Sequence, residues 1–116
     1  MKNGRYEEYG EVRWFKDDEL HREDEPARIW SDGTIGWYRH GKLHRVGCPA
    51  IKRVDGTKKW LVDGKYHRLN GPAVEYPSGR CEWWVDGVKI NITDIFGYEP
   101  SVPLTEGEQV ILRLRV

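Results

Sequence analysis

Short stretches of aromatic and β-branched residues alternate with glycine-containing turn sequences along most of the chain. One set of turn sequences predicts two-residue hairpin turns, at Asp32-Gly33, Asp55-Gly56 and Ser78-Gly79. A second set follows at His40-Gly41, Asp63-Gly64 and Asp86-Gly87. The intervals between turns are too short for helices, and their apolar positions lack a period of 3.6 residues. The pattern therefore predicts an all-β chain made of hairpins.

The pattern recurs every 23 residues, as the spacing of Trp14, Trp37, Trp60 and Trp83 shows. Four further columns keep the same offset: His21, His44 and His67; Arg22, Arg45 and Arg68; Pro26, Pro49 and Pro72; Ala27, Ala50 and Ala73. Identical columns at a fixed period indicate a repeat architecture. We predict a single domain, 1–116, with a partial repeat (1–13), full repeats (14–36, 37–59 and 60–82), a partial repeat (83–91) and a C-terminal cap (92–116).

Each unit is expected to be a β-hairpin, so that the array forms an antiparallel meander sheet of about seven strands. Equivalent positions of successive units then lie two strands apart, roughly 9–10 Å. Whether this sheet stays open or rolls up is not decided by the repeat.

The repeat stops after Lys89, where other residue types occupy the His-Arg columns. Thr105 followed by Glu108 is a capping box, and Val110, Ile111 and Leu114 form an apolar helical stripe, which predicts a short helix. The alternation from 112 to 116 leaves a strand as the alternative. Either element would cover the free edge of the last strand, which otherwise invites aggregation.

The segment DGKYHRLNGPAVEYPSGR, residues 63–80, carries the repeat in its clearest form. It resembles MORN repeats, and most closely the variant in which arginine follows the histidine and Gly-Pro-Ala comes after. That variant occurs in small tailed-phage proteins of unassigned role and, more loosely, in bacterial antitoxin-like proteins. The resemblance covers about residues 10–89. It implies a binding platform, and its phage-borne members suggest a host-interaction or anti-defence role.

The first copy departs from this pattern. Asp18 stands where Gly41 and Gly64 stand in the later copies, and Glu25 stands where Gly71 does. Because glycine supplies the positive φ of tight turns, looser turns are expected in the first copy.

The chain has 19 basic and 19 acidic residues, a formal net charge of zero, so its overall charge does not favour nucleic acid or membrane. The charge is unevenly placed: residues 1–25 have 5 basic and 9 acidic side chains, 26–68 have 10 and 3, and 69–116 have 4 and 7. A basic middle between acidic ends suits a protein partner or head-to-tail self-association. Two unmatched cysteines, Cys48 and Cys81, and no apolar leader or membrane segment predict a cytoplasmic protein, in the host cytoplasm if phage-encoded.

Candidate partner-binding residues are those of the basic middle, Arg39, Lys42, Lys52, Arg53, Lys58 and Lys59, with two tryptophans outside the ladder column, Trp30 and Trp84. We favour a protein as the partner of these residues. Alternatively, they bind the phosphates of a nucleotide or nucleic acid, or they form a solvated sheet face without a ligand. An acidic cluster comprises Asp17, Asp18, Glu19, Glu23, Asp24 and Glu25. A solvated loop explains this cluster more simply than mimicry of nucleic acid.

The repeated columns are interpreted as scaffold. The tryptophan ladder is expected to form the core of a thin sheet, since each ring buries about 150–250 Å²; the alternative is a stacking platform for bases or sugars. The His-Arg pairs are expected to bond turn carbonyls and lock each hairpin onto the next, although a row of cations could also grip an anionic ligand.

Metal binding and catalysis have little support in the sequence. Histidines about 9–10 Å apart cannot share a zinc ion that needs ligands within about 2.1 Å. There is no nucleophile beside a base and no phosphate-binding glycine loop before a helix. A flat repetitive sheet also lacks the concave pocket that enzymes usually need. The sequence therefore predicts a non-enzymatic protein without metal or cofactor.

Overall fold

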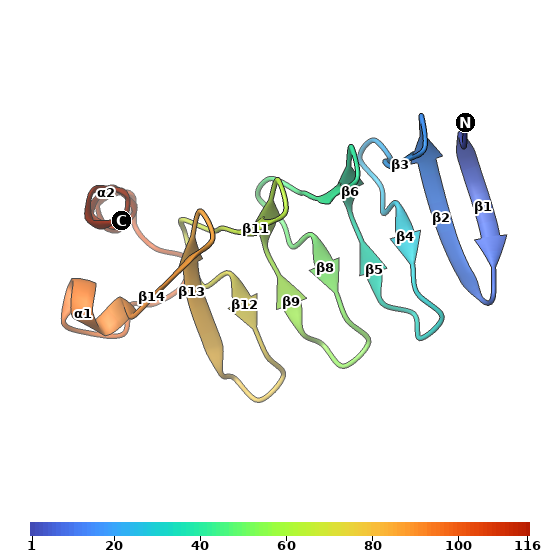
Figure 1. Cartoon of the computed structure of the whole chain (residues 1–116). Coiled ribbons are helices and arrows are strands. Elements are labelled where there is room, and N and C mark those ends of the chain that lie inside the picture. The colour runs from blue at the N-terminus through green and yellow to red at the C-terminus, as the bar shows by residue number, and fades with distance from the viewer.

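The computed structural model describes residues 1–116 as an elongated strip of short strands with two helices at its C-terminal end (Figure 1). The strip measures 50 × 28 × 19 Å along its principal axes. The termini lie at opposite ends, because successive units are added side by side in one direction. None of the helices has the length and apolar character needed to cross a bilayer.

The chain forms fourteen strands and two helices. In chain order they are β1 (Gly4–Glu8), β2 (Glu11–Lys16), β3 (Glu19–Leu20), β4 (Arg28–Ile29), β5 (Ile35–Gly36), β6 (Tyr38–Arg39), β7 (Lys42–Leu43), β8 (Ile51–Lys52), β9 (Lys58–Lys59), β10 (Leu61–Val62), β11 (Lys65–Tyr66), β12 (Val74–Glu75), β13 (Cys81–Val85), β14 (Val88–Ile90), α1 (Ile92–Phe96) and α2 (Glu106–Arg115).

The main sheet is an antiparallel meander in the order β1-β2-β4-β5-β8-β9-β12-β13-β14, with β3 paired to β2. The predicted antiparallel meander is confirmed. The expected number of about seven strands was too low, because each unit turns twice. After leaving the main sheet the chain forms a second, smaller hairpin, such as β6-β7 or β10-β11, above it.

The turns at Asp32-Gly33, Asp55-Gly56 and Ser78-Gly79 contain three residues, not the expected two. In the first full unit the Trp30 amide donates to the Thr34 carbonyl at 2.8 Å, and the Gly33 amide donates to the Trp30 carbonyl at 2.9 Å. Gly33 has φ 92°, the conformation that closes a three-residue hairpin loop with a bulge. The extra residue determines which side chains emerge on each face of the next strand.

The turns of the small hairpins do contain two residues. His40 and Gly41 both have positive φ, 48° and 81°, which is the type I′ geometry that matches the twist of short hairpins. In the first copy Asp17 and Asp18 adopt the same geometry, with φ of 50° and 68°. The expectation of a looser turn there was wrong, because aspartate tolerates the left-handed region better than most residues do.

The ladder tryptophans all lie on one face of the sheet, here called the tryptophan face. Trp37, Trp60 and Trp83 are buried and Trp14, in the first copy, is half-buried. The backbone amides of the first three ladder tryptophans donate to the carbonyls of fully buried alanines, as the bond from Trp37 to Ala50 at 2.8 Å illustrates. Small and large side chains thus alternate across the strip and form its thin core.

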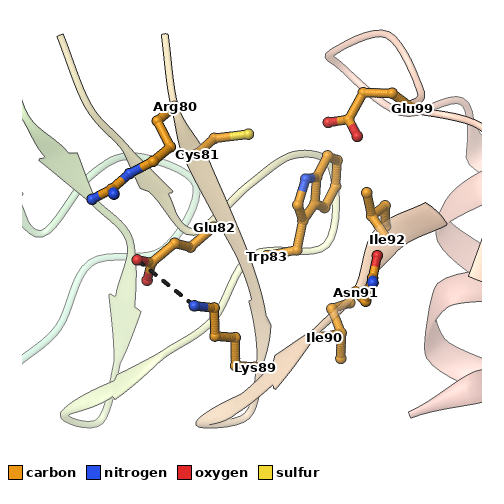
Figure 2. A pocket seen from close by; sticks show the side chains of 9 residues that line it. All are labelled: Arg80, Cys81, Glu82, Trp83, Lys89, Ile90, Asn91, Ile92 and Glu99. Atoms are coloured by element: carbon orange, nitrogen blue, oxygen red, sulfur yellow. Dashed lines mark ion pairs between the residues drawn. The ribbon is translucent and has the colours of Figure 1, made fainter. Parts of the chain in front are cut away.

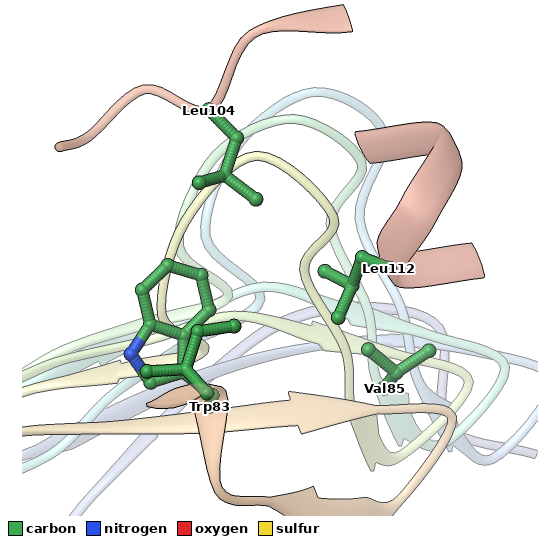
Figure 3. Close-up of a cluster of buried hydrophobic side chains, with 5 residues drawn as sticks. Trp83, Val85, Leu104 and Leu112 are labelled. Carbon is green, nitrogen blue, oxygen red and sulfur yellow. The ribbon is translucent and has the colours of Figure 1, made fainter. Parts of the chain in front are cut away.

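The C-terminal cap packs on the tryptophan face of the last hairpin. Leu104 and the α2 residue Leu112 point toward Trp83 and Val85 of β13, and Ile92 of α1 completes this buried cluster (Figure 3). The capping box of α2 is present, since the Thr105 hydroxyl accepts from the Glu108 amide at 3.1 Å. The predicted C-terminal helix is therefore confirmed, and the alternative of a strand was wrong.

Candidate functional site

The repeated histidines join neighbouring units. Nδ1 of His44 accepts a hydrogen bond from the Asp63 amide in the next small turn, and Nδ1 of His67 accepts one from the Asp86 amide, each at 3.0 Å. In the first copy His21 accepts from the His40 amide at the same distance. The partners are turn amides rather than the expected turn carbonyls. An Nδ1 that accepts places the proton of the neutral ring on Nε2.

The repeated arginines cover the tryptophan rings. The guanidinium carbon of Arg45 lies 3.9 Å from the centre of the Trp37 ring, and that of Arg68 lies 3.8 Å from the centre of Trp60. Each arginine also donates to the carbonyl of the proline four residues later, as Arg45 does to Pro49 at 3.2 Å. These charges are used in cation–π and hydrogen-bond contacts within the scaffold.

The opposite face of the main sheet, here called the open face, is not covered by the cap. It bears Trp30, Ile51, Arg53 and Lys59, as strand alternation from the pair Ile51–Lys59 requires. Lys52 and Lys58 pair with each other in the same hairpin and project from the tryptophan face, where the Lys52 ammonium lies 5.7 Å from the Trp37 ring.

The other two residues of the predicted basic centre, Arg39 and Lys42, form a pair in the small hairpin β6-β7. The basic centre is therefore divided among two faces and the row of small hairpins. It does not form one continuous patch.

A hollow of about 240 Å³ lies on the open face where the first and second full units meet. It brings together three of the predicted binding residues, Trp30, Arg53 and Lys59, and is completed by Asp32, Thr34 and Ile51. Trp30 follows β4, Arg53 follows β8, and Lys59 lies in β9. The hollow thus offers an indole, an aliphatic side chain and two cations within one small concavity.

Gly36 makes room for the indole of this hollow. A Cβ atom at this position would lie 2.9 Å from the Trp30 ring and 3.1 Å from the Tyr38 ring. The guanidinium carbon of Arg28 lies 4.4 Å from the centre of the Trp30 ring. Sequence reasoning missed Gly36. The signal that could have revealed it lies in the repeat, where the next unit has Lys59 in the same column.

Hydrogen bonds favour the charged form of two carboxylates, that of Asp32 at the edge of the hollow and that of Glu11 beside Arg28. The Thr34 amide donates to Asp32 at 2.8 Å, and this bond lowers the pKa of the Asp32 carboxyl below its ordinary value. Hydrogen bonding from Arg28, at 2.9 Å, is the largest cause of the lowered pKa of Glu11. Arg28 is therefore paired, whereas Arg53 and Lys59 have no ion-pair partner within 4 Å. Neither cation is neutralised by a carboxylate, and the Lys59 ammonium lies 6.0 Å from the centre of the Tyr66 ring.

Trp84, the other predicted recognition aromatic, lies two units away on the same face. Its indole Nε1 donates to Glu82 at 2.9 Å, and this bond is the largest cause of the lowered pKa of the Glu82 carboxyl. Its ring centre lies 5.1 Å from that of Tyr66. Trp84 is half-buried in these contacts and does not line the hollow.

A second concavity, of about 400 Å³, lies at the junction of β13, β14 and α1 (Figure 2). On the tryptophan face it is lined by Cys81, Trp83, Ile92 and Glu99. The indole Nε1 of Trp83 is buried without a hydrogen-bond partner. Burial is the largest cause of the raised pKa of the Cys81 thiol, and the charge of Glu99 adds to it. None of the predicted binding residues lies here.

The acidic residues of the first copy do not form one continuous patch either, because they lie in different turns and contacts. Asp17 and Asp18 form a small turn, and the Glu23 carboxylate lies 2.7 Å from Nε2 of His21, which is the first cause of its lowered pKa. No group of three or more histidine, cysteine or acidic residues is arranged to hold a metal ion. Comparison of the chain with protein-family models, with curated proteins and with solved structures finds no match.

Proposed function

We propose that this protein is a non-enzymatic binding module that recognises an acidic segment of a partner protein on its open face. The observation that carries this proposal is the convergence of Trp30, Arg53 and Lys59 around the hollow between two units. These residues are separated by up to 29 positions in the sequence, and the register of the sheet brings them together. They are also among the positions where the copies differ from one another.

The chemistry of the hollow fits a short acidic segment with an apolar or aromatic residue. Trp30 and Ile51 supply apolar surface, and tryptophan and arginine are the residue types that most often carry the binding energy of interfaces. Arg53 can hold a carboxylate through two parallel N–H···O bonds, and Lys59 adds a second charge. Asp32 at the edge of the hollow disfavours a ligand of high negative charge density.

The distribution of the basic residues supports a protein partner over a nucleic acid. Phosphate-backbone binding uses many cations along one continuous surface. Here Lys52 and Lys58 project from the opposite face to Arg53 and Lys59. A compact acidic segment needs only the two cations of the hollow, whereas a strand of nucleic acid would reach few of the others.

The kind of partner is proposed from the resemblance to MORN repeats. Because the chain resembles phage-borne arrays, we propose a host protein as the partner and a host-interaction or anti-defence role in the host cytoplasm. The two free thiols, Cys48 and Cys81, support a reducing compartment.

The decisive experiment compares two double variants in the same pair of strands. Arg53→Glu/Lys59→Glu reverses the charges of the hollow, and Lys52→Glu/Lys58→Glu makes the same charge change on the opposite face. Partners captured by the wild-type protein from bacterial lysate are identified by mass spectrometry, purified and titrated against both variants by calorimetry. Trp30→Ala is titrated in parallel, with an expected loss of ten-fold or more in affinity, about 1.4 kcal/mol or above.

The proposal requires that the hollow variant lose binding and that the opposite-face variant keep it. Equal losses in both variants would show that only net charge matters. Tight binding of RNA or DNA oligonucleotides that collapses with salt, in the absence of a protein partner, would overturn the proposal in favour of nucleic-acid binding.

A further inference from the structure

The helix α2 has apolar side chains on both of its sides. Its inner side is anchored by Leu112, which is completely buried against β13 (Figure 3). Its outer side exposes Val110 (48%), Ile111 (45%) and Leu114 (80%). Soluble surfaces tolerate single exposed apolar residues, but a contiguous group on one helix face is typical of an interaction site. Nothing in the chain covers this face.

Two unpaired charges of opposite sign flank the apolar residues. Glu106 and Arg113 are seven residues apart, about two helical turns, and therefore lie on the same flank of α2. Neither takes part in any of the nine ion pairs of the chain. Gly107 lies on the outer surface beyond Val110, in line with Leu114 seven residues later, and a Cβ there would meet no atom closer than 3.9 Å.

We propose that this face of α2 binds the same face of a second copy of the chain, with the two helices antiparallel about a two-fold axis. In that arrangement Leu114 of each copy fits over Gly107 of the other. Val110 and Ile111 lie nearest the axis and pack against their own counterparts. Glu106 of each copy then meets Arg113 of the other, which gives two equivalent ion pairs.

The charges select the antiparallel direction. In a parallel pair related by a two-fold axis along the helices, the flank bearing Glu106 and Arg113 lies on opposite edges of the contact in the two copies, so neither charge meets its opposite. In the antiparallel pair both contacts are attractive, and the negative N-terminal turn of each helix lies beside the positive C-terminal turn of the other. A two-fold axis also makes the interface self-complementary and closed, so the pairing stops at two copies.

The small size of the surface determines the expected affinity. Three apolar side chains per copy bury less area than the roughly 1,200–2,000 Å² of a standard stable interface. We therefore expect a monomer–dimer equilibrium with a Kd on the order of micromolar, about −8 kcal/mol. Salt weakens the dimer only in part, because the ion pairs lie at the rim of an apolar contact.

The test is sedimentation equilibrium of the full chain over a range of concentrations. Leu114→Glu is expected to abolish the dimer, and Glu106→Arg or Arg113→Glu alone to weaken it about ten-fold. The double variant Glu106→Arg/Arg113→Glu restores it, because the pairs re-form with exchanged signs. Arg115→Glu is the matched control: the same charge change on the same helix, but on the flank away from Glu106 and Arg113. It leaves the Kd unchanged.

Helical circular dichroism shows whether α2 remains folded in each variant. A wild-type protein that stays monomeric at several hundred micromolar, or a double variant as weak as the single ones, would overturn the proposal. A dimer that survives Leu114→Glu would place the interface elsewhere. The pairing does not depend on the hollow of the open face, so Arg53→Glu/Lys59→Glu is expected to dimerise like the wild type.

Discussion

Nδ1 of His44 accepts a hydrogen bond from the backbone amide of Asp63, 3.0 Å away, across the boundary between two repeat units. Asp63 has φ 50° and opens the small turn of the next unit, so its amide has no partner within its own hairpin. The same bond recurs from His21 and from His67. The histidine column therefore helps to hold each small hairpin on the one before it, together with backbone bonds such as that from the Gly64 amide to the Leu43 carbonyl at 2.8 Å.

Replacing His44 with alanine removes this acceptor and is expected to lower the free energy of unfolding by about 1 kcal/mol, the usual net value of one such bond. His67→Ala should have a similar effect. Chemical denaturation with Trp fluorescence measures both. His44→Asn can keep an acceptor near the Nδ1 position and should lose less. If the alanine variants were as stable as the wild type while partner binding vanished, the histidines would be binding residues rather than links between units.

Replacing Gly36 with alanine places a Cβ 2.9 Å from the Trp30 ring, so the ring must leave its seat over β5. Because Gly36 is not among the positive-φ residues, the backbone itself accepts alanine and the effect falls on the hollow. We expect a small loss of stability, about 1–3 kcal/mol as in other overpacked sites. A shifted Trp emission maximum and weaker partner binding should accompany it. Unchanged emission and affinity would mean that the seat of Trp30 is unimportant.

Acid is expected to destabilise the sheet through Glu11 and Glu82. Both carboxyls have a folded pKa below the ordinary 4.5, Glu11 mainly because of Arg28 and Glu82 mainly because of Trp84. A lowered folded pKa contributes stability that is present above the unfolded value and lost as the pH falls through the folded one. The free energy of unfolding should therefore decrease below about pH 4.5, and less steeply in Glu11→Gln/Glu82→Gln.

Glu8→Gln is the control for that titration, because this exposed carboxylate has no ion-pair partner. Its acid profile should match that of the wild type. A double variant with the full wild-type pH dependence would show that other carboxyls carry the effect.

The two thiols should differ in reactivity. Burial raises the pKa of Cys81, and the thiolate is the reactive form, whereas Cys48 is exposed in a loop. Iodoacetamide at neutral pH is therefore expected to modify Cys48 first, with Cys81 reacting at a comparable rate only after unfolding. Peptide mass spectrometry over a time course measures both rates. Equal rates in the native protein would contradict the burial of Cys81.

The sequence by itself determined the scaffold. A period of 23 residues with turn signals in every unit requires successive hairpins to pair with their neighbours, and the Thr105–Glu108 capping box specifies the start of the final helix. These features depend on contacts between near neighbours in the chain, which residue types and spacing reveal. The tertiary structure was needed wherever register or packing decided the outcome.

Lys52 and Arg53 show the difference most plainly. They are adjacent in the sequence and were predicted to act together, yet they project from opposite faces of the sheet, and only Arg53 joins Trp30 and Lys59 at the hollow. A three-residue loop with a bulge sets the strand register, and a shift of one residue exchanges the faces of a whole strand. The sequence determined that hairpins would stack, whereas the tertiary structure decided which side chains meet.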